Sequence, residues 1–321
     1  MASAKAITAG FIDILKADTI LNTQVAAAVT VIGDRWAFMI IRDVYLGIRR
    51  FEALKRSTGA ARGTLASRLK ALVSNGILYK QVYESSSTRQ DYRLTDKGLG
   101  LYPVVLTLWV WDSRWASGSD LPQQLIHKVC GHATVPTYQC GTCREAVKSA
   151  DVSWSVGPSF QVLAEVPPRH QRRTKSPCEQ GNGAVNGQLN ALDCIGDRWT
   201  SLVLAAAFFG LRRFDDITSA IGIATNILSD RLRLLVQAQI LEKVMYQEQP
   251  LRNEYRLTDK GRDLYPYVVA LHDWANRWLV EPGKGALLLQ HTPCNTALRG
   301  EIICSHCQRA LYPQDVTYGP V

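Results

Sequence analysis

Apolar residues recur at helical spacing in several consecutive segments of the chain. In the segment 60–74, Leu65, Leu69, Leu72 and Val73 fall on one face, and the polar side chains largely fall off it. Asn75-Gly76 ends this pattern. The same spacing predicts earlier helices over 22–31, 35–44 and 51–57, and a long aromatic helix over 99–115.

After residue 76 the pattern changes to a two-residue period. Residues 78–83 alternate like a strand, 84–88 form a polar turn, and 90–94 are typical of a second strand. Thr95 is placed to cap the helix that follows. A short helix, a tight turn at Gly59, a second helix and then a hairpin indicate a helix-turn-helix followed by a wing.

The whole pattern occurs twice in the chain, at a separation of 163 residues. Ile-Gly-Asp-Arg-Trp stands at 32–36 and again at 195–199, and Tyr-Arg-Leu-Thr-Asp-Lys-Gly stands at 92–98 and again at 255–261. The motif Gly-x-Arg-Arg-Phe is repeated in the same way. The second copy predicts helices over 198–208, 214–220 and 224–237, a hairpin over 241–257 and a helix over 258–279. Two similar domains in one chain could act as a built-in dimer.

A second repeated pattern, His-x2-Cys-x9-Cys-x2-Cys, follows each copy. The first copy has His127, Cys130, Cys140 and Cys143, and the second copy has His291, Cys294, Cys304 and Cys307. Three cysteines and a histidine in two short pairs is a donor set that tetrahedral zinc prefers. We therefore expect two structural zinc ions per chain, one in each consecutive set.

Other interpretations of these cysteines stay open. The cysteines could pack as small apolar residues in a ribbon without metal, or form a redox switch. His132 and His306 have no equivalent in the other copy and are interpreted as bystanders, and Cys178 and Cys194 as structural residues.

These patterns predict an α+β fold, mostly α, with two winged helix-turn-helix domains in tandem, each followed by a small zinc-ribbon-like module. The length of 321 residues fits about two winged domains, and the 46% apolar content is enough for two cores. A Pro-containing basic stretch over 167–175 is typical of a linker. The expected boundaries are 1–118 and 185–282 for the winged domains, 119–158 and 283–321 for the Cys/His ribbons, and 159–184 for the linker.

The net charge of +9 and the pI of about 9.2 fit a polyanionic partner, although charge alone is weak evidence. The charge is unequally divided: residues 31–116 carry a net +7, and the matching residues 194–279 carry a net +1. No signal pattern or membrane-length apolar run is found, so we expect a cytoplasmic protein without a membrane partner.

The order of these motifs resembles the HxlR-type winged-helix transcriptional regulators. The resemblance covers residues 22–116 and 185–279 and includes the Leu-x-x-Arg-Leu-x-x-Leu helix at 65–72 and 228–235. It implies a dimeric regulator whose N- and C-terminal helices form the dimer contact, here 12–31, 97–116 and their counterparts. Most members have one domain, whereas this chain has two.

Many HxlR-type members also carry a reactive cysteine about ten residues before the Ile-Gly motif. Thr23 and Asn186 stand at these positions, so a thiol-based sensor is not carried over.

The resemblance makes the two recognition helices candidates for DNA contact, because the first residues of such a helix approach the base edges. Exposed polar residues could otherwise be only a solvated face. The candidates are Arg62, Thr64, Ser67, Arg68 and Lys70 in the first copy, and Thr225, Asn226, Ser229, Arg231 and Arg233 in the second. Arg89 and Arg252 in the wings are candidates for phosphate or minor-groove contacts. The pairs before the short helices are candidates for phosphate contact, or one member of each for a helical cap or a surface ion pair: Arg49 with Arg50, and Arg212 with Arg213.

Together these features predict a sequence-specific regulator that binds duplex DNA as a single-chain pseudo-dimer, with a homodimer of chains left open. No nucleophile, phosphate-loop or metalloprotease motif is found, so we do not expect an enzyme. The alternative is a protein-interaction module that uses its aromatic helices. A small-molecule effector could bind between these helices, at Trp109, Trp111, His272 and Trp274, although aromatic stripes more often form a core.

Overall fold

The computed structural model describes residues 20–83, 86–115, 125–159 and 190–318. The chain divides into two compact units, and each unit is built from three stretches of sequence. Unit 1 contains residues 198–298 with 20–29 and the described part of 147–174. Unit 2 contains residues 30–146 with 190–197 and 299–318, apart from the gaps given above. The first winged domain thus lies in unit 2, and the second lies in unit 1.

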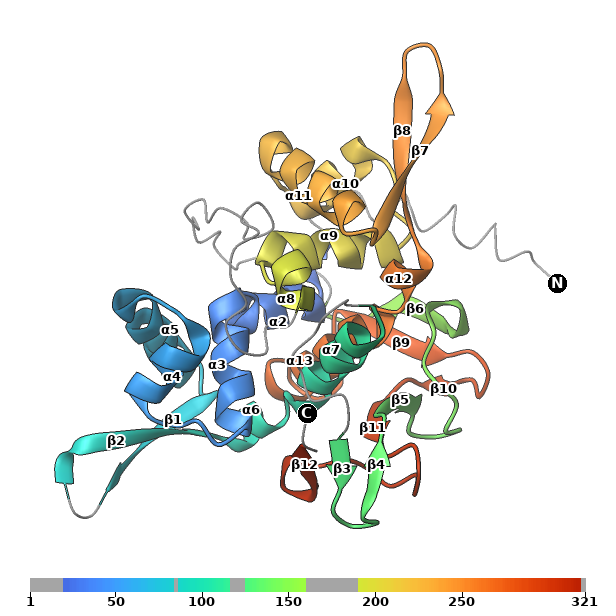
Figure 1. The fold of residues 1–321 in the computed structure, drawn as a ribbon. Helices are drawn as coiled ribbons and strands as arrows, with labels where there is room; N and C mark the ends of the chain where they lie inside the picture. The colour runs from blue at the N-terminus through green and yellow to red at the C-terminus, as the bar shows by residue number, and fades with distance from the viewer. Residues whose placement is uncertain (1–19, 84–85, 116–124, 160–189, 319–321) are drawn as a thin grey trace. The chain divides into compact units, whose positions relative to one another are not determined.

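The winged domain of unit 2 has the predicted order of elements. Leu65, Leu69 and Leu72 of its third helix are buried as expected, whereas Val73 is only half-buried. The hairpin follows this helix directly (Figure 1). The elements are α3 (Arg35–Tyr45), α4 (Phe51–Thr58), α5 (Arg62–Ser74), β1 (Leu78–Tyr83), β2 (Ser86–Leu94), α6 (Asp96–Leu99) and α7 (Tyr102–Trp115).

Local hydrogen bonds explain where these elements begin and end. Asp34 caps α3 by accepting a hydrogen bond from the backbone N–H of Ala37 at 3.0 Å. Gly59 ends α4 with a φ of 69°, a left-handed conformation that glycine adopts without strain. Thr95 caps α6 by accepting from the N–H of Gly98 at 3.1 Å, as predicted.

The winged domain of unit 1 repeats this arrangement. Gly222 ends the short helix with a φ of 62°, and Thr258 caps the helix after the hairpin. In each domain the hairpin also bonds to the residue before the short helix: Tyr92 N–H donates to Arg49 O at 2.9 Å, and Tyr255 N–H to Arg212 O at 2.8 Å. The elements are α9 (Arg198–Phe208), α10 (Phe214–Ile221), α11 (Thr225–Gln237), β7 (Leu241–Gln247), β8 (Arg252–Leu257), α12 (Asp259–Arg262) and α13 (Tyr265–Trp278).

The prediction of one aromatic helix over 99–115 is wrong for its first residues. The turn α6 ends at Leu99 and α7 begins at Tyr102, and the second copy is divided in the same way between α12 and α13. Leu101 N–H bonds to Gly98 O, three residues back, which tightens the chain between the two helices.

Each unit also contains residues of the helix that begins the other copy: residues 24–29 of α2 in unit 1 and the whole of α8 in unit 2. In unit 1, Gln24 of α2 (Gln24–Ile32), which follows the turn η1 (Ile20–Asn22), accepts from Leu287 N–H at 3.1 Å and donates to Asn276 Oδ1 at 2.8 Å. In unit 2, Asp112 of α7 is fully buried and accepts from the N–H of Ala191 in α8 (Asn190–Ile195) at 2.8 Å. Residues 12–19 and Asn186 lie outside the described residues.

The two Cys/His segments do not form separate sheets. In unit 2, β12 of the second copy pairs with β3 of the first, with Val316 opposite His127, and β11 pairs with β5. In unit 1, β6 of the first copy pairs with β9 of the second, with Val152 opposite His291. The elements are β3 (Leu125–His127), β4 (His132–Thr134), β5 (Thr137–Cys140), η2 (Ser149–Asp151), β6 (Val152–Val156), β9 (Leu287–His291), β10 (Thr296–Ala297), β11 (Gly300–Ile303), η5 (Pro313–Asp315) and β12 (Val316–Tyr318). Of the predicted linker over 159–184, the structure describes only position 159. Cys178 lies outside the described residues.

Candidate nucleic-acid surfaces and metal site

The α5 helix turns a polar face to solvent. Arg62, Ser67 and Lys70 are exposed, and Thr64 is half-buried at the edge of this face. Arg62 forms an exposed ion pair with Glu52 at 3.2 Å and lies 5.3 Å from the ring centroid of Phe51. The opposite face of α5 is the leucine face that packs into the core, so this helix can contact a partner without unfolding.

Arg68 is the most constrained of the predicted contacts on α5. Its Nε lies 3.1 Å from Asp34 Oδ1, and its side chain is 32% exposed. Burial raises the pKa of Asp34, and the positive charge of Arg68 opposes that effect. Arg68 is therefore engaged with the cap of α3, which orients its guanidinium group.

The corresponding helix in unit 1, α11, has a more neutral surface. Thr225, Asn226 and Ser229 are exposed. The hydroxyl group of Ser229 donates a hydrogen bond to Thr225 O at 2.9 Å. Arg233 is also exposed, but it forms an ion pair with Asp230 at 3.3 Å. Arg231, the counterpart of Arg68, is half-buried.

The basic residues before the short helices are exposed in both units. Arg50 lies 3.9 Å from Asp91, and Arg213 lies 4.8 Å from the ring centroid of Tyr246. Arg49 and Arg212 have exposed side chains, while their carbonyl groups hold the hairpin. In the wings, Arg252 is exposed, whereas the side chain of Arg89 lies outside the described residues.

One basic residue beside the α5 face was missed in the sequence. Lys80 of β1 is exposed, and its ammonium lies 5.9 Å from the ring centroid of Tyr92. It shares with Lys70 and Ser74 the wall of a pocket of about 430 Å³ between α5 and the hairpin. The alternation over 78–83 places Lys80 on one side of a strand, but only the folded hairpin brings it beside Lys70.

In unit 2 four of the predicted metal ligands lie together, and they come from both copies. The ligand atoms of His127, Cys130, Cys304 and Cys307 are all within 4.8 Å of one another. This grouping corrects the predicted set His127, Cys130, Cys140 and Cys143, and likewise the set that joined His291 and Cys294 to Cys304 and Cys307. The physical reason is the strand exchange, because β12 and β11 bring the end of the second copy onto the ribbon of the first.

The geometry of this tetrad fits a tetrahedral metal ion. His127 Nδ1 lies 3.5 Å from Cys130 Sγ and 3.3 Å from Cys307 Sγ, and Cys130 Sγ lies 3.9 Å from Cys304 Sγ. Zinc bonds of about 2.3 Å to sulfur and about 2.0 Å to nitrogen would place such atoms about 3.5–3.8 Å apart. The tetrad can therefore hold a metal ion of this size with little movement of its ligands.

The thiol of Cys304 has an environment that favours the thiolate. Burial acts to raise its pKa, but hydrogen bonds from Thr134 and from the backbone of Cys307 and His306 outweigh burial and lower it to about 6. A thiolate is the form of cysteine that binds metal.

The four remaining predicted ligands have the same local geometry as these. In unit 1, His291 Nδ1 lies 3.4 Å from Cys294 Sγ. In unit 2, Cys140 N–H donates to Glu145 O at 2.9 Å, just as Cys304 N–H donates to Arg309 O. Cys143 is half-buried. Cys194, interpreted as structural, is also half-buried.

His132 and His306, which were interpreted as bystanders, are not among the four clustered ligands but contact each other. Their rings stack at 3.6 Å between centroids, beside the tetrad. The repeat did not reveal this pair, because neither histidine has an equivalent in the other copy.

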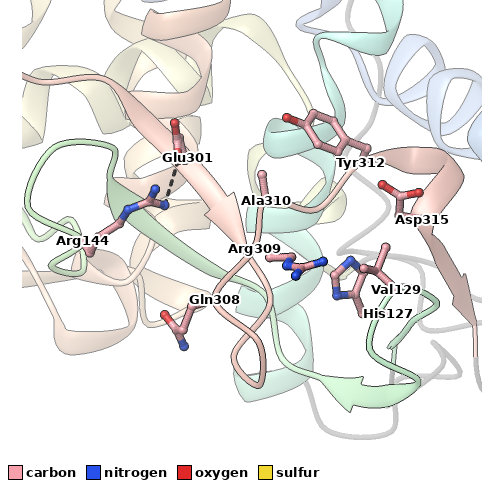
Figure 2. Close-up of a pocket in the computed structure, with 9 residues that line it drawn as sticks. All are labelled: His127, Val129, Arg144, Glu301, Gln308, Arg309, Ala310, Tyr312 and Asp315. Atoms are coloured by element: carbon pink, nitrogen blue, oxygen red, sulfur yellow. Dashed lines mark hydrogen bonds and ion pairs between the residues drawn. The ribbon is translucent and has the colours of Figure 1, made fainter.

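A pocket of about 510 Å³ borders the tetrad (Figure 2). His127 lines it together with Arg309, Tyr312 and Asp315, and the ion pair of Arg144 with Glu301 at 3.1 Å lies on its wall. The Nε2 atom of His127 is buried and has no hydrogen-bond partner among the described residues. The ring thus uses only its Nδ1 edge to face the cysteines.

The residues of the predicted effector pocket are buried in their own units. Trp109 and Trp111 in unit 2, and Trp274 in unit 1, are at most 5% exposed. His272 in unit 1 is held against Leu287 O, with its Nε2 3.2 Å away, and lies 3.2 Å from Asn276 Nδ2. Neither of the two pockets described above includes any of these residues.

Comparison with known proteins agrees with the winged domains. The model of the "HxlR-like helix-turn-helix" family matches residues 31–120 and 194–282. An HTH-type transcriptional regulator of Mycobacterium tuberculosis is 40% identical over 130 residues, which are 40% of this chain and 82% of the relative. The HTH-type transcriptional regulator YodB of Bacillus subtilis is 33% identical over 104 residues, which are 32% of this chain and 92% of the relative.

A solved structure, that of the protein PA1607, is 32% identical and covers 41% of this chain and 93% of its own, with a TM-score of 0.38. Within the described residues, no helix has both the length and the apolar character that a bilayer span requires. The family is one of transcriptional regulators and not of enzymes. Since its model matches both copies and more than half of the sequence, the chain belongs to the HxlR-like helix-turn-helix family.

Proposed function

We propose that the protein is a sequence-specific regulator that binds duplex DNA through α5 and α11. The observation that carries this proposal is the exposed polar face of both helices, each backed by a buried leucine face within a winged helix-turn-helix. A helix held in this way fits the major groove, and its first turns approach the base edges. Arg62, Thr64 and Ser67 in unit 2, and Thr225, Asn226 and Ser229 in unit 1, are the proposed base-reading residues.

Phosphate contacts are proposed for the basic residues around these faces. The exposed basic residues proposed for this role are Arg49, Lys70 and Lys80 in unit 2, and Arg212, Arg213 and Arg252 in unit 1. Phosphate contacts set the register of a protein on DNA but carry no sequence information. Arg68 and Arg231 act in this proposal mainly by orienting their helices, since Arg68 pairs with Asp34.

The two copies are proposed to act as a pseudo-dimer within one chain. The support is that each unit incorporates part or all of the first helix of the other copy: residues 24–29 of α2 in unit 1, and α8 in unit 2. The two recognition faces differ, with Arg62 and Ser67 replaced by Thr225 and Asp230, so the operator is expected to be an imperfect palindrome.

Selection of duplexes by the full chain from a random pool tests this function. We expect enrichment of one imperfect palindrome, bound by one chain as measured by the mass of the complex. The variant Thr225→Arg/Asp230→Ser gives α11 two residues of α5 and should make the two half-sites more alike. The control Glu281→Gln, at an exposed position after α13, should leave the selected site unchanged. Absence of salt-dependent DNA binding would support a protein-interaction module instead.

We also propose that the Cys/His ligands bind zinc as a structural ion, two per chain. The tetrad in unit 2 supports this by its donor set and its spacing, and all four positions are taken by protein ligands, so no open position remains for catalysis. When bound, the ion would hold together the two short ligand pairs, His127 with Cys130 and Cys304 with Cys307, where the apolar core is small. Elemental analysis of the purified chain should give close to two zinc ions, and a value near zero would exclude this cofactor.

We propose an effector response at the aromatic helices as well. The aromatic residues of α7 and α13 remain candidates for contact with a small apolar molecule, and their burial means that such a molecule would have to displace packed side chains.

A further inference from the structure

The metal ligands of unit 2 are supplied by distant parts of the chain. Cys130 and Cys304 are 174 residues apart in sequence, yet their Sγ atoms are 3.9 Å apart. His127 and Cys130 form one knuckle, and Cys304 and Cys307 form the other. Each knuckle offers two ligands, whereas a structural zinc ion needs four.

Further contacts between the copies surround these four ligands. Ser305 N–H donates to Thr134 Oγ1 at 2.9 Å, and Val135 N–H donates to Ser305 Oγ at 3.2 Å. The rings of His132 and His306 stack beside them, and β12 continues the sheet of β3 at His127. The tetrad is thus part of a shell in which the two copies alternate, rather than a chance approach of two loops.

We infer that the metal ion of this tetrad cross-links the two copies. The site is complete only when each copy contributes its own pair of ligands. The inference rests on the proposed zinc only for the identity of the ion. A cross-link between positions so far apart restricts the unfolded chain strongly, because the closed loop is long. Metal binding and the docking of residues 299–318 on the first copy's ribbon are then one event.

Cadmium-113 NMR of the full chain directly tests this metal cross-link between the copies. Cadmium takes the place of zinc in thiolate sites, and its coupling to cysteine Hβ protons identifies the sulfur ligands of each ion. We expect one cadmium signal to correlate with Cys130, Cys304 and Cys307 together. A signal that joins Cys130 to Cys140 and Cys143 would overturn the inference, and so would a chain that binds no cadmium at these cysteines.

Two double variants of the full chain provide an independent measurement on His127. In zinc-loaded protein with nitrogen-15 histidine, the imidazole signal reports whether Nδ1 is bound to metal, and His127→Asn assigns it among the six histidines. Cys304→Ser/Cys307→Ser should remove the metal-bound signal of His127, whereas Cys140→Ser/Cys143→Ser should retain it. The reverse result, or a metal-bound signal in both variants, would show that the ligands are not shared as inferred.

Discussion

The residue after each pair of metal ligands has a left-handed backbone conformation. Gly131 has a φ of 72°, and Arg144, Asn295 and Gln308 have φ values between 55° and 67°. This conformation costs a residue other than glycine or asparagine roughly 1–2 kcal/mol. Its presence at Arg144 and Gln308 indicates that the turn is dictated by its surroundings, which fits a turn shaped to present two cysteines to one ion.

Gly98 packs against a carbonyl group at the start of the helix after the wing. A Cβ atom at this position would lie 2.2 Å from Ile77 O, whereas one at Gly63, in α5, would meet nothing within 4 Å. Gly98→Ala is therefore expected to lower the free energy of unfolding by about 2–3 kcal/mol. The matched change Gly63→Ala should raise it by about 0.5–1 kcal/mol, because alanine is the better helix former. Denaturant titration of both variants checks this, and equal effects would contradict the close approach.

Asp34 provides a test of burial at the cap of α3. Its pKa in the folded state is raised above the ordinary value near 4, chiefly by burial. Protonation therefore favours the folded state, and this contribution to stability grows as the pH falls through the raised pKa toward 3.8. Asn also caps helices but does not titrate. The stability of the wild type relative to Asp34→Asn should thus increase from pH 7 to pH 4 in urea titrations. A difference that stays constant or shrinks on acidification would show that the pKa is not raised.

At the scale of elements, the two recognition helices have the same fold but different electrostatics. Lys70 of α5 and Lys80 of the hairpin line one pocket, whereas the counterpart of Lys70, Arg233, is paired with Asp230. The short helices differ in the same direction, since Lys55 and Arg56 of α4 have no basic counterparts in α10. The first copy is therefore expected to supply most of the phosphate affinity.

Paired alanine variants test this difference. Lys70→Ala/Lys80→Ala should weaken binding to the selected duplex and reduce the slope of log affinity against log salt by about two, because each lysine is expected to neutralise one phosphate. The counterpart variant Arg233→Ala/Lys243→Ala should have a clearly smaller effect. Fluorescence anisotropy at several salt concentrations measures both, and an equal weakening in the two variants would argue against a dominant first copy.

The elements themselves were predictable, because local patterns decide them. Thr95 and Gly59 mark boundaries that depend on residues a few positions away, and the structure confirms both. Contacts such as Arg68 with Asp34, or Lys80 beside Lys70, depend on how the helices and hairpin pack, so spacing along one element could not reveal them. The break at Gly100 was missed because apolar residues continue on both sides of it.

At the scale of the whole molecule, the exchange of segments between the copies could not be read from the sequence. Each strand or ligand pair of one copy has a near-equivalent in the other copy. The local sequence pattern therefore allows β3 to pair with β6 almost as well as with β12. Which of the two it pairs with is decided by the path of the chain. The prediction of consecutive metal ligands failed for this reason, although all four residues of the tetrad were among the predicted ligands.

Removal of metal should therefore affect more than a small ribbon. Removal of metal from the full chain by a chelator is expected to lower the temperature at which residues 299–318 unfold. We expect the free energy of unfolding of this segment to fall by roughly several kcal/mol. Hydrogen exchange at the β12–β3 and β11–β5 pairs should rise at the same time, while exchange at the Leu69 and Leu72 amides of α5 should change little. A chain whose β12 amides remain as protected without metal as with it would contradict this expectation.

The exchanged strands also bear on how the two halves of the gene can change. A substitution on one recognition helix affects one half-site and leaves the other intact, so the two helices can diverge. The winged domains that carry them, residues 31–116 and 194–279, already differ in net charge, at +7 and +1. A substitution in β3 must be tolerated by β12, which descends from the opposite half. Neither half can then be deleted without leaving the other with an unpaired strand and an incomplete set of metal ligands, and the duplication, once fixed, is difficult to reverse.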